Sequence, residues 1–181
     1  MKHSLFRSVR LVGLAAFVAA ALAHEAAAEV FVDLGFNSTS VDADLGTDPR
    51  NEISTDASGL HLGLGIRRDL QQGTIGARLE LDDLDDEQLL AVRAFDYGRH
   101  VSERFTLTAF AGAARLDLET PAYGWYFGGG VQLKDLWPRW SLSVDVRFGD
   151  KLARDNFDSQ AVRPDDFYDL TGVTLYLSRG F

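Results

Sequence analysis

From about residue 30 to the last residue, apolar side chains recur at every second position over long stretches of the chain. The residues between them are mostly polar, charged or glycine. This two-residue period is the repeat of a β-strand, whereas a helix needs a period near 3.6. The pattern therefore predicts an all-β protein. The clearest apolar rows are Val30/Val32/Leu34/Phe36, Leu60/Leu62/Leu64/Ile66, Ile75/Ala77/Leu79/Leu81, Tyr123/Trp125/Phe127, Trp140/Leu142/Val144/Val146/Phe148 and Val173/Leu175/Leu177.

The alternating stretches predict eight strands of roughly 9 to 13 residues each. Strands of soluble sandwiches usually have about 5 or 6 residues, whereas a tilted strand needs about 9–11 residues to cross a membrane. The predicted lengths therefore favour a membrane protein. The phase of the alternation is ambiguous in 89–100, and it slips near Ala113–Leu116, where we expect a β-bulge. The expected strands are 30–38, 57–68, 73–82, 89–100, 105–116, 123–134, 140–150 and 168–181.

The connectors between these strands fall into two alternating classes. The short turns are 69–72, 101–104 and 135–139, and the acidic connectors, most of them longer, are 39–56, 83–88, 117–122 and 151–167. The formal charge is −4 for 39–56, −4 for 83–88, −2 for 117–122 and −2 for 150–167. A membrane barrel has one rim of short periplasmic turns and one rim of longer extracellular loops. The sequence therefore predicts an eight-stranded antiparallel up-and-down transmembrane β-barrel.

Charged residues also occupy the polar face of the predicted strands. An Arg or Lys that faces lipid at mid-membrane costs roughly 2–4 kcal/mol, so we expect these side chains to face inward and to pair with one another. The interior of an eight-stranded barrel is just wide enough for its own side chains. Inward glycines would leave room for the arginines, so we expect a filled lumen rather than a wide pore. The predicted charge network, four basic and four acidic residues, is Asp33, Arg67, Arg78, Glu80, Asp82, Arg93, Asp145 and Arg147.

A soluble lipocalin-like barrel is the alternative fold. Such a barrel would bury its apolar residues inside, and it would not explain aromatic residues at the strand ends. Aromatic residues at these positions form the interfacial girdles of membrane barrels. The predicted interfacial aromatics are Tyr123, Trp125, Trp140 and Phe148.

The first 28 residues have the layout of a secretory signal peptide. Three basic residues precede a short apolar run, Leu11–Ala23, and small residues follow at two candidate cleavage sites, after Ala23 and after Ala28. We expect residues 1–28 to be removed and 29–181 to form the barrel domain. Removal changes the formal net charge from −9 to −11, which argues against nucleic acid as a partner. Without cysteine, the chain has no disulfide, thiolate metal site or lipoprotein anchor.

The chain resembles the small outer-membrane β-barrel proteins of Gram-negative bacteria, the OmpA/OmpX-like group. The stretch "GWYFGGGVQL" and the alternating C-terminal strand that ends on Phe181 carry this resemblance, over the whole of 29–181. It implies an outer-membrane location, contact with outer-membrane lipids including lipopolysaccharide, and insertion by the barrel assembly machinery. It also implies an assembly signal formed by Val173, Leu175, Leu177 and Phe181, although Arg179 departs from the hydrophobic residue usual in that group.

Two groups of residues are candidates for a site, one catalytic and one for a divalent metal ion. Some barrels of this kind are lipid-modifying enzymes that use His, Ser and an acidic residue, and here His61 lies near Ser58. Nothing in the sequence requires these two to meet, so we predict no catalytic residue. The acidic segments 39–56 and 83–88, which include Asp83, Asp85 and Asp86, do not match the EF-hand spacing. We predict no metal site and no cofactor, with a weak divalent site shared with lipopolysaccharide phosphates as the alternative.

The function predicted from these features is a structural or surface-interaction role in the outer membrane, carried by the acidic loops at 39–56 and 150–167. A narrow channel for small solutes is the main alternative, because inward salt bridges can rearrange. A lipid-modifying enzyme is a weaker one. The extracellular partner, the cleavage site used and the oligomeric state are left open by the sequence.

Overall fold

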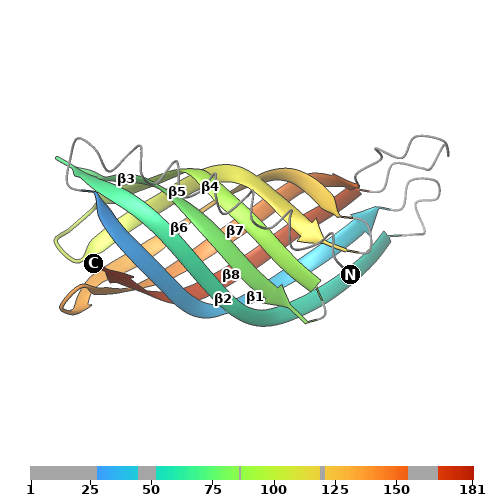
Figure 1. Ribbon diagram of the computed structural model, residues 1–181, viewed down its shortest axis with the longest axis horizontal. Helices are drawn as coiled ribbons and strands as arrows, with labels where there is room; N and C mark the ends of the chain where they lie inside the picture. The colour runs from blue at the N-terminus through green and yellow to red at the C-terminus, as the bar shows by residue number, and fades with distance from the viewer. Residues whose placement is uncertain (1–27, 45–51, 86, 119–120, 155–166) are drawn as a thin grey trace, which may run out of the picture.

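A computed structural model of the chain describes residues 28–44, 52–85, 87–118, 121–154 and 167–181. These residues form eight antiparallel strands in a closed up-and-down barrel, β1 to β8 in sequence order, as the sequence predicts (Figure 1). No helix in the described residues is long and apolar enough to cross a membrane. The strands are β1 (Glu29–Asp44), β2 (Glu52–Leu70), β3 (Gly73–Leu84), β4 (Glu87–His100), β5 (Phe105–Asp117), β6 (Ala122–Trp137), β7 (Trp140–Arg154) and β8 (Phe167–Gly180).

The first and last strands close the barrel. β1 pairs with β8 from Phe31 opposite Gly180 to Asp44 opposite Phe167. The amide of Phe181 extends this contact by donating to the Val30 carbonyl over 2.9 Å. Every backbone group that faces lipid must find a partner within the protein, which a closed barrel achieves because it has no free edge there.

The two faces of the wall have opposite character. Along β1 the exposed residues are Val30, Val32, Leu34 and Phe36, while Phe31 and Asp33 between them are buried. The same division holds for β8, where Val173 and Leu175 are exposed and Thr174 and Tyr176 are buried. Apolar side chains on the outside and polar ones inside are the pattern of a membrane barrel, and the reverse of a soluble one.

Several strands are longer than the predicted 9 to 13 residues. β2 has 19 residues and β1 has 16, because their ladder continues through most of the connector predicted at 39–56. β2 meets β3 from His61 onward, so the segment 52–60 of β2 is paired with β1 alone. The alternation weakens in this part of the sequence because the outer segments do not contact lipid, and the prediction therefore ended these strands too early.

The expected bulge near Ala113–Leu116 is wrong. β5 alternates without a break, with Ala114 and Leu116 inside. The irregularity lies in β4, where Arg93 pairs with Gly112 and Phe95 pairs with Ala111, so Ala94 is the extra residue. Apolar residues occupy both faces of β5 near its outer end, which explains why the alternation in the sequence suggested a slip there. The bulge in β4 explains why 89–100 had no single phase.

Candidate functional site

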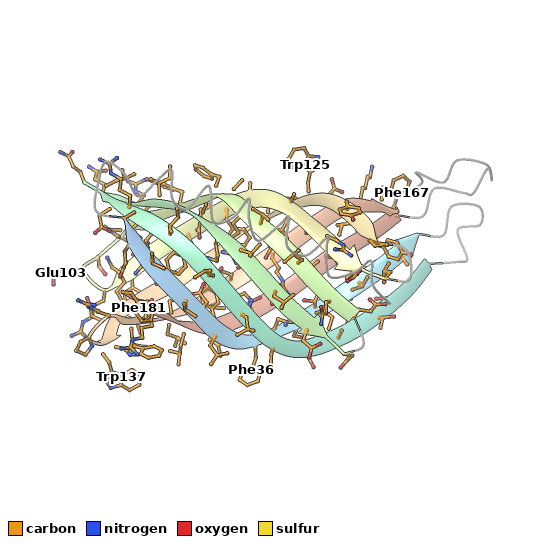
Figure 2. All side chains as sticks on the ribbon, viewed as in Figure 1. Phe36, Glu103, Trp125, Trp137, Phe167 and Phe181 are labelled. Carbon is orange, nitrogen blue, oxygen red and sulfur yellow. The ribbon has the colours of Figure 1, made fainter. Side chains whose placement is uncertain are left out.

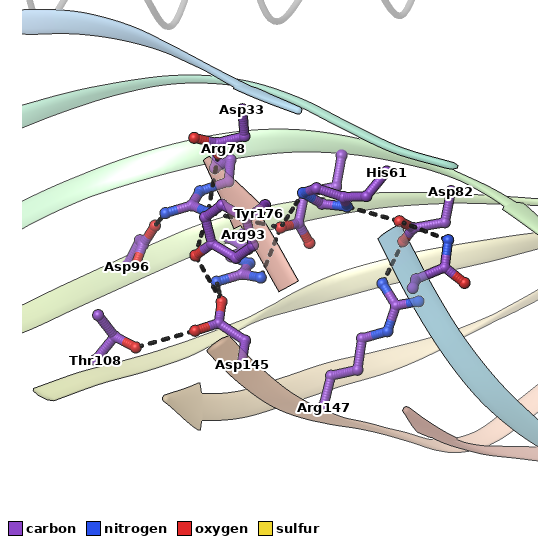
Figure 3. Close-up of polar contacts among 12 residues, drawn as sticks. Asp33, His61, Arg78, Asp82, Arg93, Asp96, Thr108, Asp145, Arg147 and Tyr176 are labelled. Carbon is purple, nitrogen blue, oxygen red and sulfur yellow. Dashed lines mark hydrogen bonds and ion pairs between the residues drawn. The ribbon is translucent and has the colours of Figure 1, made fainter. Parts of the chain in front are cut away.

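Buried ion pairs cross the middle of the lumen, centred on Arg93 (Figure 3). This guanidinium lies 2.6 Å from Glu80 and 2.7 Å from Asp145, and all three side chains have no solvent exposure. The ring of Phe110 stacks against Arg93 at 3.4 Å. The Tyr126 hydroxyl donates to Glu80 over 2.8 Å, which ties β6 to β3 across the barrel. Strands that are not neighbours are thus joined through the lumen.

Arg78 continues the network toward the short-turn end. Its guanidinium contacts Asp33 at 3.0 Å on β1 and Asp96 at 2.9 Å on β4. It also donates to the hydroxyl of Tyr176 over 2.8 Å, and that hydroxyl donates to Asp145 over 2.8 Å. Tyr176 therefore links the Arg78 and Arg93 groups into one network.

A second group lies toward the outer end of the lumen. His61 Nδ1 is 2.6 Å from Asp82, and the other oxygen of Asp82 pairs with Arg147. Arg147 also donates to Thr39 over 2.8 Å. His61 Nε2 lies 4.0 Å from Glu80, so this histidine connects the two groups and has a carboxylate on each side (Figure 3).

The structure brings seven of the eight predicted charges together in the lumen and leaves out Arg67. That side chain lies at the short-turn rim, where it pairs with Glu29 at 2.6 Å. Asp96, which the sequence analysis missed, takes a place in the network instead. The predicted balance of four against four is therefore wrong: five carboxylates face three guanidinium groups. His61 lies between Asp82 and Glu80, 2.6 and 4.0 Å from their carboxylates.

Glycines make room for the larger members of the network. A Cβ at Gly65 would collide with the ring of Phe31, which lies between the guanidinium groups of Arg67 and Arg78 at 5.1 and 5.0 Å. A Cβ at Gly63 would lie 2.7 Å from the carboxylate of Asp33. The inward glycines therefore accommodate an aromatic ring and a carboxylate as well as arginines.

An apolar cluster continues from the network toward the end of the lumen where β3, β5 and β7 finish. The sequence analysis did not predict it. Its signal was present, because Leu84, Leu116 and Leu170 interrupt what would otherwise be a polar inner face. The cluster lies above the ion pairs, and a cavity of about 270 Å³ remains beside Ala57, Leu84 and Tyr168. Its buried members are Ala57, Leu84, Leu89, Ala91, Phe110, Ala114, Leu116, Ala122, Tyr126, Leu152, Tyr168 and Leu170.

The predicted aromatics lie on outward positions of the wall, and Figure 2 labels one of them, Trp125. Trp125 is 74% exposed near the outer end, and Tyr123 and Phe148 are also exposed, while Trp140 at the short-turn end is half-buried. Trp137, which was not predicted, is 63% exposed beside Trp140. The residues of the predicted assembly signal face outward on β8, and Phe181 is 61% exposed. Their role in assembly stays a prediction.

The alternative sites receive no support from these contacts. Ser58 is exposed and lies on the outward face of β2, whereas His61 is buried on the inward face, so the two side chains point apart. The described residues contain no group of three or more His, Asp or Glu placed to hold a metal ion. Asp83 faces outward and Asp85 lies in the turn after β3, while Asp86 falls outside the described residues.

Comparison with solved structures identifies the fold. The chain is similar to Ail, the attachment invasion locus protein of Yersinia pestis, with a TM-score of 0.55 and 11% identity over 84% of this chain and 98% of that one. Neisserial surface protein A is similar with a TM-score of 0.51 and 11% identity, over 84% of this chain and 97% of that one. The outer membrane protein OprG of Pseudomonas aeruginosa is similar with a TM-score of 0.50 and 13% identity, over 86% of this chain and 97% of that one. The fold is that of the small outer-membrane β-barrels.

No family model matches this chain, and no curated protein matches it. The agreement with Ail and OprG is therefore one of architecture. Together with the apolar outer wall and the charged lumen, it agrees with the outer-membrane location that the sequence predicts.

Proposed function

We propose that this protein is a non-conducting outer-membrane barrel that interacts with other molecules through its outer surface. The observation that carries the proposal is the filled lumen, in which Arg93, Glu80 and Asp145 form ion pairs without solvent exposure. Hydrated solutes need a water-lined path, and side chains that are fully buried do not line one. The part of the molecule left for interaction is the end where the long strands carry the acidic loops.

The outer end is acidic on its exposed face. Asp56 on β2 and Asp169 on β8 lie on outward positions, as do four other aspartates of that end. Among the side chains that the structure describes there, the basic ones outside the lumen are Arg115, which pairs with Asp117, and the exposed Lys151 of β7. Charge complementarity favours partners with a basic surface. Ail, by contrast, has been solved with the heparin analogue sucrose octasulfate, a polyanion. The outward aspartates on the described strands at this end are Asp42, Asp56, Asp83, Asp117, Asp150 and Asp169.

Binding to vesicles tests this proposal. The protein is reconstituted in uncharged phosphatidylcholine, and retention of a labelled lysine-rich peptide is measured by sedimentation. We expect retention that D42N/D56N/D169N reduces severalfold, and no retention of sucrose octasulfate. A matched variant at the short-turn end, D69N/E103Q/D135N, removes the same number of acidic residues and should retain the peptide. Equal retention by both variants would contradict the assignment to the outer surface.

A narrow channel remains the second candidate, because the ion pairs could rearrange under voltage. Planar-bilayer recording separates the two functions. The closed lumen leads us to expect no discrete conductance events from the unmodified protein. Events that disappear when Arg78 and Glu80 are neutralised would favour the channel instead.

A lipid-modifying enzyme is less well supported, since both ring nitrogens of His61 face carboxylates and Ser58 points to the other face. Mass spectra of lipid A from cells that carry the protein or its H61A variant test this reading. We expect identical spectra, and a modification that depends on His61 would overturn the expectation.

A further inference from the structure

Five exposed arginines surround the barrel at the end with the short turns. Arg68 lies on β2, Arg99 on β4 and Arg179 on β8, while Arg104 and Arg139 lie in the β4–β5 and β6–β7 turns. The strand order around the barrel therefore distributes them over its circumference. Trp137 and Phe181 mark this end in Figure 2.

Three of these arginines lie on the lipid side of the wall. The outward row of β2 runs through Leu64 and Ile66 to Arg68, and the outward row of β8 runs through Leu175 and Leu177 to Arg179. Arg99 follows the outward residues of β4 in the same way. Each arginine thus takes the place where an apolar row reaches the membrane surface, with its aliphatic part beside lipid and its charge directed to the headgroups.

None of the five arginines forms an ion pair with a carboxylate of the described residues. Arg67, Arg78, Arg93, Arg115 and Arg147, in contrast, each lie within 4.0 Å of at least one carboxylate. The guanidinium of Arg179 instead lies 5.6 Å from the ring of Trp140 and 5.2 Å from that of Phe181. Both rings lie on the outer wall, so these contacts hold the guanidinium of Arg179 at the level of the membrane interface.

Most carboxylates of the same end do not share this outward face; the exception is Asp135, which is exposed near the end of β6. Asp69 follows the inward row of β2, and Glu103 lies in the β4–β5 turn at the far tip of the barrel (Figure 2). On β8, ten residues separate the outward Asp169 from the outward Arg179, which is about 33 Å of strand. At the tilt of about 40° usual for such barrels, this corresponds to ~25 Å along the membrane normal, the height of the apolar band. The arginines are therefore at headgroup depth.

We propose that this arginine ring binds the phosphate groups of anionic phospholipids in the periplasmic leaflet of the outer membrane. The guanidinium fork matches phosphate oxygens in pairs, and its charge is not already used by a carboxylate. The opposite end carries outward aspartates, so the protein distinguishes the two leaflets by charge. The short turns at the arginine end identify that end as periplasmic.

Lipid-selective fluorescence quenching tests the ring directly. The chain has three tryptophans, and W125F leaves Trp137 and its cross-strand partner Trp140, both at the arginine end. The folded W125F protein is reconstituted in phosphatidylcholine vesicles that contain brominated phosphatidylglycerol or brominated phosphatidylcholine. Quenching against mole fraction gives the relative affinity of the two lipids at this rim. We expect the anionic lipid to be preferred by roughly threefold or more, since each basic residue near the surface attracts anionic lipid appreciably.

Charge variants then identify the residues responsible. Adding R68Q, R99Q and R179Q to W125F should reduce the preference to about one, whereas R115Q, a single outward arginine of the outer end that is already paired with Asp117, should leave it unchanged. Each single variant is measured as well, so that a triple variant that fails to fold does not prevent the test. No preference in W125F, or an equal preference in folded variants without these arginines, would overturn the proposal.

A reporter at the opposite end completes the comparison. W137F/W140F leaves Trp125, which lies near the aspartates of the outer end. We expect no preference for phosphatidylglycerol there. An equal preference at both ends would attribute the effect to the membrane as a whole and contradict a specific ring.

Discussion

Replacing Arg93 with methionine removes the charge at the centre of the lumen while keeping much of the apolar volume of the side chain. Asp145 would then be buried without a guanidinium partner, and Glu80 would keep only Arg78 at 3.9 Å, since their contacts at 2.6 and 2.7 Å are to Arg93. Removing one partner from a buried ion pair typically costs about 3–5 kcal/mol. The hydroxyls of Tyr126 and Tyr176 still donate to the two carboxylates, which places the expected loss near the lower end of this range.

A loss of about 3 kcal/mol lowers the ratio of folded to unfolded protein more than 100-fold. Urea unfolding of the protein in phospholipid vesicles, followed by tryptophan fluorescence and by heat modifiability on gels, measures this change. The matched control is R115M, because Arg115 forms an exposed pair with Asp117 at 2.7 Å. Exposed pairs contribute about 0–1 kcal/mol, so we expect R115M to be nearly as stable as the unmodified protein.

The double variant R93M/E80Q separates the charge effect from simple loss of packing. It removes one of the two carboxylates that lose their close contact with Arg93 in R93M, so it should be more stable than R93M by about 1–2 kcal/mol. If R93M loses less than about 1 kcal/mol, or if E80Q adds its full cost on top of R93M, the ion pairs do not hold the lumen together. The filled lumen would then rest on packing alone.

Three further variants test other parts of the structure. H61F removes the partner that Asp82 has at 2.6 Å and should lower the unfolding free energy by about 1–3 kcal/mol in the same urea assay. G65V places a side chain against the ring of Phe31, and overpacking of this kind should cost about 1–3 kcal/mol, whereas no change would show that the ring moves freely. Deletion of Phe181 removes the amide that donates to β1 and should weaken the fast-migrating unboiled band in outer membranes, while an unchanged band would contradict its role as an assembly signal.

The pattern of alternation was sufficient to predict the eight strands, their faces and most of the inward charges, because side-chain direction along a strand follows from position alone. It was not sufficient for contacts across the barrel. Tyr176 meets Arg78 although 98 positions separate them, and this depends on the register of every strand between β3 and β8. Asp96 was missed because the bulge at Ala94 reverses the phase of β4. Arg67 was predicted to belong to the lumen network, whereas it pairs at the short-turn rim with Glu29, the first residue of β1.

The charges on the outer wall also fix how deep the barrel sits in the membrane. On β2 the outward charges are Asp56 and Arg68, twelve residues apart, which is about 40 Å of strand and ~30 Å along the normal at the usual tilt. This distance and the ~25 Å spanned on β8 bracket the height of the apolar layer, which is about 25–30 Å. A shift in either direction would move an aspartate or an arginine toward lipid chains, where charge is unfavourable. Because the two ends carry opposite charges, the same rows that set the depth also make the two orientations in the membrane unequal in energy.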